Sequence, residues 1–95
     1  MQKIIKRTLT LFILVFLISV SASEEKSFSH NGLERSYHLH IPQDLEEKAP
    51  LVVVIHGYTS SAENIMSYSE MNEVADREGF AVIYPQGTID SQGNA

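Results

Sequence analysis

The chain has 95 residues, contains no cysteine and carries a formal net charge of −5 at pH 7. Without cysteine, these residues can form neither a disulfide framework nor a thiol nucleophile. Three of the 7 basic residues and none of the 12 acidic ones lie in residues 1–22, so residues 23–95 hold four basic and 12 acidic residues, a net charge of −8. A negative surface argues against nucleic acid or an anionic membrane as the main partner.

Residues 1–22 have the three-part order of a secretory signal peptide. A basic start is followed by the apolar run Leu9–Val20 and by small residues at Ser21-Ala22, where a signal peptidase would cut. An uncleaved membrane anchor is the alternative, but this run of about 12 residues is shorter than the roughly 18 apolar residues that cross a bilayer. We therefore expect a secreted protein, extracellular or periplasmic, with no stable membrane anchor after cleavage.

After the leader, the polar segment 23–26 is expected to fray. An antiparallel hairpin is predicted to follow it over residues 27–42. Asn31-Gly32 tolerates the positive φ angles of a type I′ turn, which places the turn there. Beyond it, apolar and polar side chains alternate, as in a strand with one covered face. The apolar set is Tyr37, Leu39 and Ile41, and the polar set is Ser36, His38 and His40.

Two buried strands are predicted after a solvated connection at residues 43–50. Residues 51–55 are apolar at every position, which suits a central strand of a parallel sheet that is buried on both faces. Residues 80–84 have the same character and are closed by Pro85. The last ten residues, 86–95, are mostly small and polar and are predicted to be a loop.

The segment between these strands has helical spacing from residue 60 to residue 78. Ser60 or Ser61 can cap its start, Ser69 can restart a second helix after a break, and Gly79 fits the stop position. The apolar stripe contains Met66, Tyr68 and Met71, and Tyr68 could instead line an acyl pocket. The acids form a solvated face: Glu70, Glu73, Asp76 and Glu78.

These elements predict an α/β fold in which a β-hairpin is followed by a βαβ unit of a mostly parallel sheet. Ligands of open α/β sheets bind where the carboxyl ends of the strands meet. The two loops that leave those ends are His56-Gly57-Tyr58-Thr59 and Pro85-Gln86-Gly87-Thr88. We therefore expect both loops on one rim of the sheet.

The run Leu51–Gly57 is followed by Ala75-Asp76, Gly79-Phe80 and Tyr84-Pro85-Gln86-Gly87. With these motifs, residues 28–88 resemble the polyhydroxybutyrate depolymerase and feruloyl esterase group of α/β-hydrolases. The His-Gly turn alone is weakly specific, because many α/β-hydrolases share it, and the downstream motifs make the resemblance stronger. The resemblance implies that residues 23–95 are the N-terminal portion of an α/β-hydrolase domain that ends before its nucleophile.

The resemblance also implies an oxyanion hole in the loop after the first buried strand. The backbone N–H of Tyr58 maps to the donor, with Thr59 as a possible helper, and His56 and Gly57 support the turn. Many members have Cys where Tyr58 stands, and since the donor is the amide, this change should affect the acyl pocket more than the hole. A preorganised donor of this type can stabilise the transition state by about 3 kcal/mol.

No catalytic triad is present in the 95 residues. The nucleophile of such enzymes is the serine of Gly-x-Ser-x-Gly, followed along the chain by an acid and a histidine. Every serine here lacks those flanking glycines. We therefore expect the sequence to be a fragment of a longer protein, with a degenerate short product as the alternative, and we expect the fragment alone to be inactive.

Several residues have both a catalytic and a structural interpretation. His56 could be a general base, but it precedes any nucleophile, so we expect its ring to brace the turn. His30, His38 and His40 could be imagined as a metal site on the hairpin, but no carboxylate completes the shell and we expect no metal. Ser60-Ser61 could be nucleophiles, but helix capping explains them.

The function implied by the resemblance is a secreted serine carboxylic-ester hydrolase, of the polyhydroxyalkanoate depolymerase or the feruloyl or acetyl esterase type. Its partner is an ester substrate, a polyester or a plant-wall phenolic ester, and it needs no cofactor. Two alternatives stay open: a non-catalytic secreted binding module with the same fold, and a secreted serine peptidase.

Overall fold

The computed structural model describes residues 23–95, and the predicted signal peptide, residues 1–22, lies outside the described residues. Four strands and two helices follow in the order β1 (Glu24–His30), β2 (Leu33–His40), β3 (Leu51–Val53), α1 (Ala62–Ser69), α2 (Met71–Glu78) and β4 (Ala81–Pro85). Within residues 23–95 no helix is long and apolar enough to cross a membrane.

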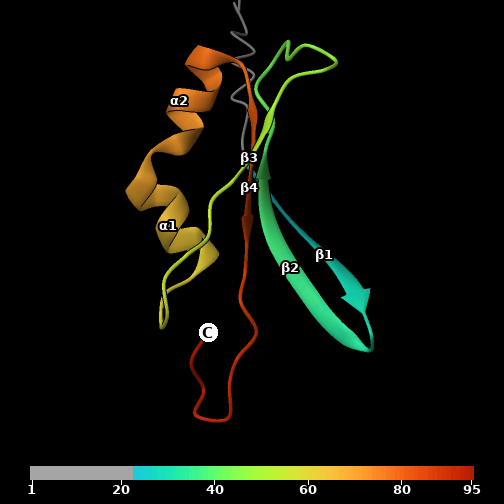
Figure 1. The fold of residues 1–95 in the computed structure, drawn as a ribbon, viewed down its shortest axis with the longest axis vertical. Coiled ribbons are helices and arrows are strands. Elements are labelled where there is room, and N and C mark those ends of the chain that lie inside the picture. Colours follow the sequence, from blue (N-terminus) through green and yellow to red (C-terminus); the bar gives the residue numbers. More distant parts are fainter. Residues whose placement is uncertain (1–22) are drawn as a thin grey trace, which may run out of the picture.

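The strands form one mixed sheet in the order β1-β2-β4-β3. The β3–β4 pair is parallel, whereas β1–β2 and β2–β4 are antiparallel. Figure 1 shows both helices on one side of β3 and β4, with the hairpin curving away on the other side of β4. An α/β arrangement of hairpin and strand–helix–strand unit is therefore present, and β4 is the strand that joins the two.

The hairpin turns at the predicted place. Asn31 has φ 52° and Gly32 has φ 78°, the pair of positive angles that a type I′ turn requires. The predicted fraying before residue 27 is wrong, because β1 begins at Glu24, which pairs with Leu39. The eight-residue strand β2 is long enough to give these polar residues backbone partners.

The predicted helical segment is two helices with a sharp break. Ser61 caps α1, its Oγ accepting the Asn64 N–H at 3.0 Å. The break lies at Glu70, which has φ 54°, and Ser69 Oγ accepts the Met71 N–H at the start of α2. Gly79, with φ 83°, ends α2 as predicted. The Ser61 cap and the Gly79 stop are thus confirmed, whereas the N-cap of α2 is Glu70, whose side chain caps nothing, one position after Ser69.

The core lies between the helices and β4. It consists of four buried side chains: Ala62, Ala75, Val82 and Tyr84. Five partly buried apolar residues pack against these four: Val54, Ile65, Met66, Met71 and Phe80. The Tyr84 hydroxyl donates to Asn72 Oδ1 at 2.6 Å, and burial raises the pKa of this tyrosine above its ordinary value of 10.0. Tyr68 is 86% exposed, so its prediction as a core residue is wrong.

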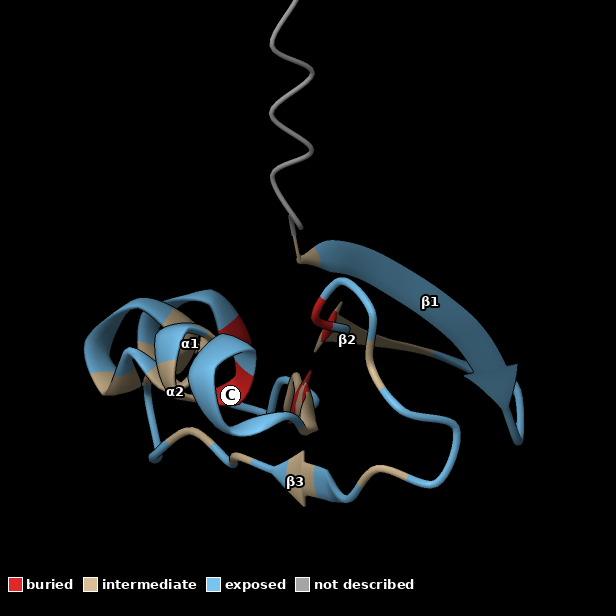
Figure 2. Ribbon diagram, turned by 90° about the horizontal axis from the view of Figure 1, so that it is seen from above, coloured by how far each residue is buried: buried red, intermediate tan, exposed pale blue. Residues whose placement is uncertain are grey.

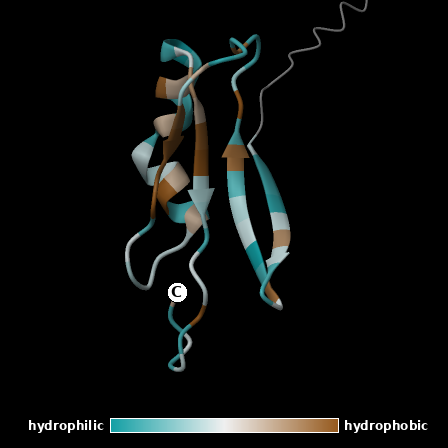
Figure 3. Ribbon diagram, turned by 45° about the vertical axis from the view of Figure 1, so that its right-hand side comes forward, coloured by the Kyte–Doolittle hydropathy of each residue, from teal (hydrophilic) through white to brown (hydrophobic). Residues whose placement is uncertain are grey.

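The first buried strand is less covered than its sequence predicts. It spans only Leu51–Val53, and Leu51 and Val53 are more than half exposed, as is Ile55 after it. Within the described residues β3 is an edge strand of the sheet, and the helices cover one of its faces (Figure 2). Figure 3 shows the apolar character of β3 and β4 beside the more polar hairpin. A fully apolar strand therefore presents one uncovered face here.

The histidines of the hairpin do not share a solvated face. His40 is 2% exposed, and its Nε2 atom lies 2.7 Å from Asp76 Oδ1 of α2. His40 pairs with Val82 of β4, and its side chain faces the helices. His30 pairs with Leu33, and its side chain lies on the opposite face of the sheet, together with Tyr37. Asp76 is accordingly a partner of His40 as well as part of the acidic face of α2.

Candidate active-site turn

His56 links the loops that follow β3 and β4. Its Nδ1 atom lies 2.7 Å from Gly57 O, and its Nε2 atom accepts the Gly87 N–H at 2.9 Å. Because Nε2 is an acceptor, the ring proton is on Nδ1, which donates to the Gly57 carbonyl. Both ring nitrogens are occupied by backbone groups.

The backbone after His56 turns within four residues. The Ser60 N–H donates to Gly57 O at 3.1 Å, and the Thr59 N–H donates to Ala95 O at 2.7 Å. The Tyr58 N–H takes part in none of the backbone hydrogen bonds found in residues 23–95. Of the two amides that the sequence suggested as donors, only Thr59 has a backbone partner within residues 23–95.

The left-handed residue of this turn is Thr59, with φ 69°. Gly57 has no positive φ, and a Cβ placed on it would meet no heavy atom within 4 Å. A β-branched residue in this region is strained, at a cost of about 1–2 kcal/mol, and such strain gathers at functional sites. The tight conformation is therefore two residues later than the glycine that sequence reasoning singled out.

Gln86 is a supporting residue that sequence reasoning quoted only as part of a motif. Its Oε1 accepts the Ala62 N–H at 2.7 Å, and its own backbone N–H donates to Ser36 O at 3.0 Å. It thereby connects β4 to the first turn of α1 and to β2. The unsatisfied amides at a helix start are the signal that could have predicted such a partner.

Tyr58 reaches the last loop through its side chain. Its hydroxyl donates to Asp90 Oδ2 at 3.0 Å. Backbone N–H groups of Asn94 and then Gln92 hold the pKa of the Asp90 carboxyl below its ordinary value, with a smaller contribution from Tyr58. The ring of Tyr58 is 69% exposed. The loop after β4 is thus organised around one ionised carboxylate that also fixes Tyr58.

A cavity of about 290 Å³ lies at this turn. It is bounded by the loops after β3 and β4 and by one side chain of the hairpin, and its lining is Arg35, Ile55, His56, Gly57, Tyr58, Pro85, Gln86, Gly87 and Ala95. Six of the eight predicted rim residues therefore line one cavity, and Thr59 and Thr88 are not among them. In the part of the chain that the structure describes, no cluster of three His, Asp or Glu side chains could hold a metal ion.

Residues 35–93 match the family described as Esterase PHB depolymerase. The chain belongs to this family. The match includes the His56 turn, both helices and the loop after β4. It confirms the resemblance to polyhydroxybutyrate depolymerases.

Curated relatives of this esterase-family chain carry esterase names. It is 34% identical over 67 residues to a bifunctional acetylxylan esterase/xylanase of Neocallimastix patriciarum, which covers 65% of this chain and 10% of the relative. It is 28% identical over 68 residues to feruloyl esterase B of Thermothelomyces thermophilus, covering 72% and 23%. The chain thus spans between a tenth and a quarter of the length of these relatives.

Solved structures agree on the fold of this family member. The S-formylglutathione hydrolase of Staphylococcus aureus has a TM-score of 0.59 at 19% identity, covering 70% of this chain and 30% of the other. The enzyme of the same name from Agrobacterium tumefaciens has a TM-score of 0.58 at 23% identity, covering 73% and 27%. The predicted α/β-hydrolase fold is confirmed.

Proposed function

We propose that this chain is the N-terminal part of a secreted serine carboxylic-ester hydrolase, to which it contributes one half of the oxyanion hole. The observation that carries the proposal is the Tyr58 amide, which has no backbone partner within residues 23–95 and borders the cavity at the carboxyl ends of β3 and β4. Membership of an esterase family and relatives named acetylxylan esterase and feruloyl esterase support the reaction class.

The Tyr58 N–H is the better of the two candidate donors. A donor for an oxyanion must be unpaired before the reaction and fixed in direction. The Thr59 N–H donates to Ala95 O. Tyr58 is held by two contacts: His56 bonds to the carbonyl of the preceding Gly57, and the Tyr58 hydroxyl donates to Asp90. These contacts support a preorganised donor without assigning any chemistry to the imidazole.

His56 acts as a brace in this proposal. A general base must accept the proton of the nucleophile on a free ring nitrogen. Nε2 of His56 already accepts from Gly87, and Nδ1 donates to the adjacent carbonyl. The proposal places the catalytic serine, acid and histidine beyond residue 95, because no serine of this sequence stands in Gly-x-Ser-x-Gly. The backbone N–H of the residue that follows the catalytic serine would be the second oxyanion donor.

Secretion is part of the same proposal and rests on the sequence of residues 1–22. The basic start, apolar run and small residues satisfy the pattern of a cleaved leader. Sequencing the N-terminus of the exported protein tests this, with a start near Ser23 expected and an intact Met1 contradicting it.

The activity is tested on the protein translated through the reading frame beyond Ala95. We expect hydrolysis of p-nitrophenyl acetate and butyrate, labelling by a fluorophosphonate, and loss of both when the serine of Gly-x-Ser-x-Gly is replaced by alanine. Absence of that motif, or a pure folded protein that neither labels nor hydrolyses, would overturn the proposal in favour of a binding module. Cleavage of matched amides at the rate of esters would indicate a peptidase.

A further inference from the structure

Among the ion pairs of residues 23–95, Arg35 has no counter-ion, and it lies on the face of the hairpin that the helices do not cover. It lies on β2 opposite Phe28, and its Nε atom is buried with no hydrogen-bond partner in residues 23–95. None of the ion pairs in that range includes it. A buried guanidinium nitrogen without a partner is costly, so this position calls for an anionic or carbonyl acceptor.

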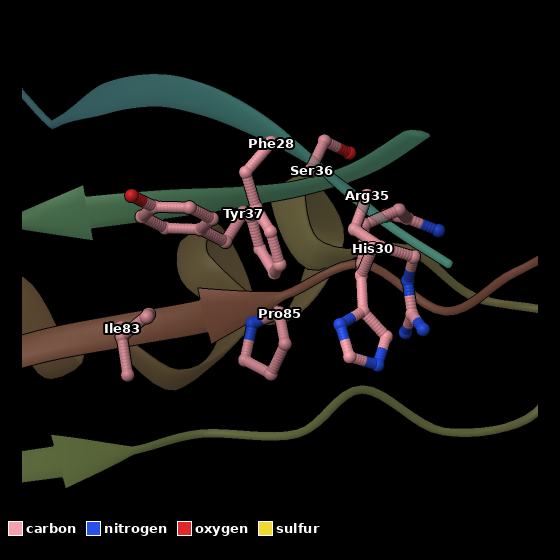
Figure 4. A pocket seen from close by; sticks show the side chains of 8 residues that line it. Phe28, His30, Arg35, Ser36, Tyr37, Ile83 and Pro85 are labelled. Carbon is pink, nitrogen blue, oxygen red and sulfur yellow. The ribbon is translucent and has the colours of Figure 1, made fainter. Parts of the chain in front are cut away.

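The Arg35 side chain connects two of the three cavities that it lines. One is the 290 Å³ cavity that also contains the Tyr58 turn. The other, of about 480 Å³, is lined mainly by apolar groups: Phe28, Tyr37, Ile83 and Pro85, with His30, Ser36 and Gln86. Figure 4 shows Arg35 and His30 extending from the hairpin toward the end of β4, beside the ring of Pro85. Arg35 is therefore within the same hollow as the proposed reaction centre.

The surroundings of Arg35 favour binding of an anion over solvation of the cation. The rings of Phe28 and Tyr37 pack edge to face with centroids 6.0 Å apart beside it, and none of the described residues that line these two cavities is an acid. Glu34 lines a third cavity together with Arg35, but it pairs with Ser29 on the other face of β2, and the ion pairs found within residues 23–95 do not join the two. Apolar walls of this kind strengthen a charged hydrogen bond compared with water.

The expected anion is a carboxylate. A guanidinium presents two parallel N–H groups that match the two oxygens of a carboxylate. A phosphate monoester carries close to two negative charges and would call for more than one cation. Among the described residues that line these two cavities, Arg35 is the only Lys or Arg, so its charge matches a monoanion.

We propose that Arg35 binds a carboxylate of the substrate, so that the enzyme selects acidic esters, such as monoesters of dicarboxylic acids or esters of uronic-acid-bearing sugars. The inference rests on the proposed function, because it places the carboxylate beside the ester held at Tyr58. Arg35 is a specificity residue here and takes no part in bond breaking.

The test compares acidic and neutral esters of the same size with the full-length enzyme. Mono-4-nitrophenyl glutarate against 4-nitrophenyl pentanoate places the carboxylate on the acyl side, and 4-carboxyphenyl acetate against 4-carbamoylphenyl acetate places it on the alcohol side. We expect kcat/KM to favour the acid by about tenfold or more in one pair. The preference should shrink as NaCl is raised.

Substitution of the arginine separates recognition from stability. R35Q should abolish the preference and leave the neutral esters within about twofold, R35K should keep part of it, and R77Q should keep all of it. Arg77 is the matched control because it is an exposed arginine on α2 paired with Glu78. No acid preference in either pair for the wild-type enzyme, or an equal loss on both esters in R35Q, would overturn the inference.

Two outcomes need separate readouts. If R35Q does not fold, competitive inhibition of the wild-type enzyme by glutarate but not by glutaramide supports the site, and equal inhibition contradicts it. If no ester of any kind is hydrolysed, the proposed function fails, while thermal stabilisation by glutarate against glutaramide still decides whether Arg35 holds a carboxylate.

Discussion

The backbone N–H of Gly87 donates to Nε2 of His56 at 2.9 Å. The imidazole of His56 thus connects the loop after β4 to the loop after β3, where its Nδ1 atom contacts the Gly57 carbonyl. The two loops come from parallel neighbours whose carboxyl ends lie on the same rim. One side chain thereby fixes the relative position of the segments that border the 290 Å³ cavity.

Replacement of His56 should separate its supporting role from a catalytic one. H56A removes two hydrogen bonds, which should lower the free energy of unfolding by about 1–3 kcal/mol. H56Q can keep an acceptor for Gly87 and should recover part of that loss and most of the esterase activity. Denaturant unfolding and kcat/KM on p-nitrophenyl butyrate, both measured on the proposed full-length esterase, give the two effects. A general base would behave differently, with H56A and H56Q both losing activity by a factor on the order of 10⁴.

Two glycines of the rim provide a matched pair. An added Cβ at Gly87 would lie 3.2 Å from His56 Nε2 and 3.3 Å from Cε1, whereas one at Gly57 would meet nothing within 4 Å. We expect G87A to cost about 1 kcal/mol or more by displacing the ring. G57A should change stability by less than about 0.5 kcal/mol, because its methyl group would meet no heavy atom. It should still lower kcat/KM, because Gly57 lines the cavity in which the ester is proposed to bind. Equal unfolding midpoints for both variants would contradict the packing argument.

Gln86 should contribute through the start of α1. Q86A removes the acceptor of the Ala62 N–H and is expected to lose about 1 kcal/mol. Q86E keeps an acceptor oxygen and adds a negative charge near the helix N-terminus, so it should equal or exceed the wild-type stability at neutral pH. Q92A is the control, because only the backbone of Gln92 is seen to bond. Equal midpoints of thermal unfolding for Q86E and Q86A would show that the contact between Gln86 Oε1 and the Ala62 N–H does not stabilise the protein.

The buried hydroxyl of Tyr84 predicts a loss of stability at alkaline pH. Burial raises the pKa of Tyr84 in the folded protein above the 10.0 of the unfolded chain, so the folded state holds this proton more tightly. The stabilisation is therefore complete below pH 10 and is lost as the pH rises through the folded pKa.

Y84F isolates this contribution. It removes the hydrogen bond to Asn72 and should cost about 1–2 kcal/mol at neutral pH while flattening the alkaline decline. Y68F, at an exposed tyrosine, should leave both the neutral stability and the alkaline slope unchanged. Unfolding free energies measured on each side of pH 10 give the comparison, and an unchanged slope in Y84F would refute the assignment.

Local chemistry made the turns and caps predictable from sequence. The Asn31-Gly32 turn, the Ser61 cap and the Gly79 stop each depend on residues within a few positions, and the structure confirms all three. The order of strands and helices followed from the change of apolar period from two to nearly four.

Contacts between distant segments were not predictable in the same way. The burial of His40 depends on Asp76, which is 36 residues away, and a polar pattern on β2 gave no sign of it. The exposure of Leu51 and Val53 depends on which strands and helices surround β3, a property that an apolar run cannot encode. The strain at Thr59 likewise arises from the loops that meet there. A lone arginine in a strand, such as Arg35, carries no motif from which a binding role could be predicted.

The position of β4 between β2 and β3 has a consequence for the order in which the protein assembles. The hairpin can close on itself soon after residue 40 is made, but β3 has no partner in this sheet until residues 81–85 arrive some thirty positions later. Pairings of such separation form slowly, and an apolar strand that waits unpaired is prone to associate with other chains. The delay would suit the proposed export, because β3 and β4 cannot pair before residues 81–85 have emerged.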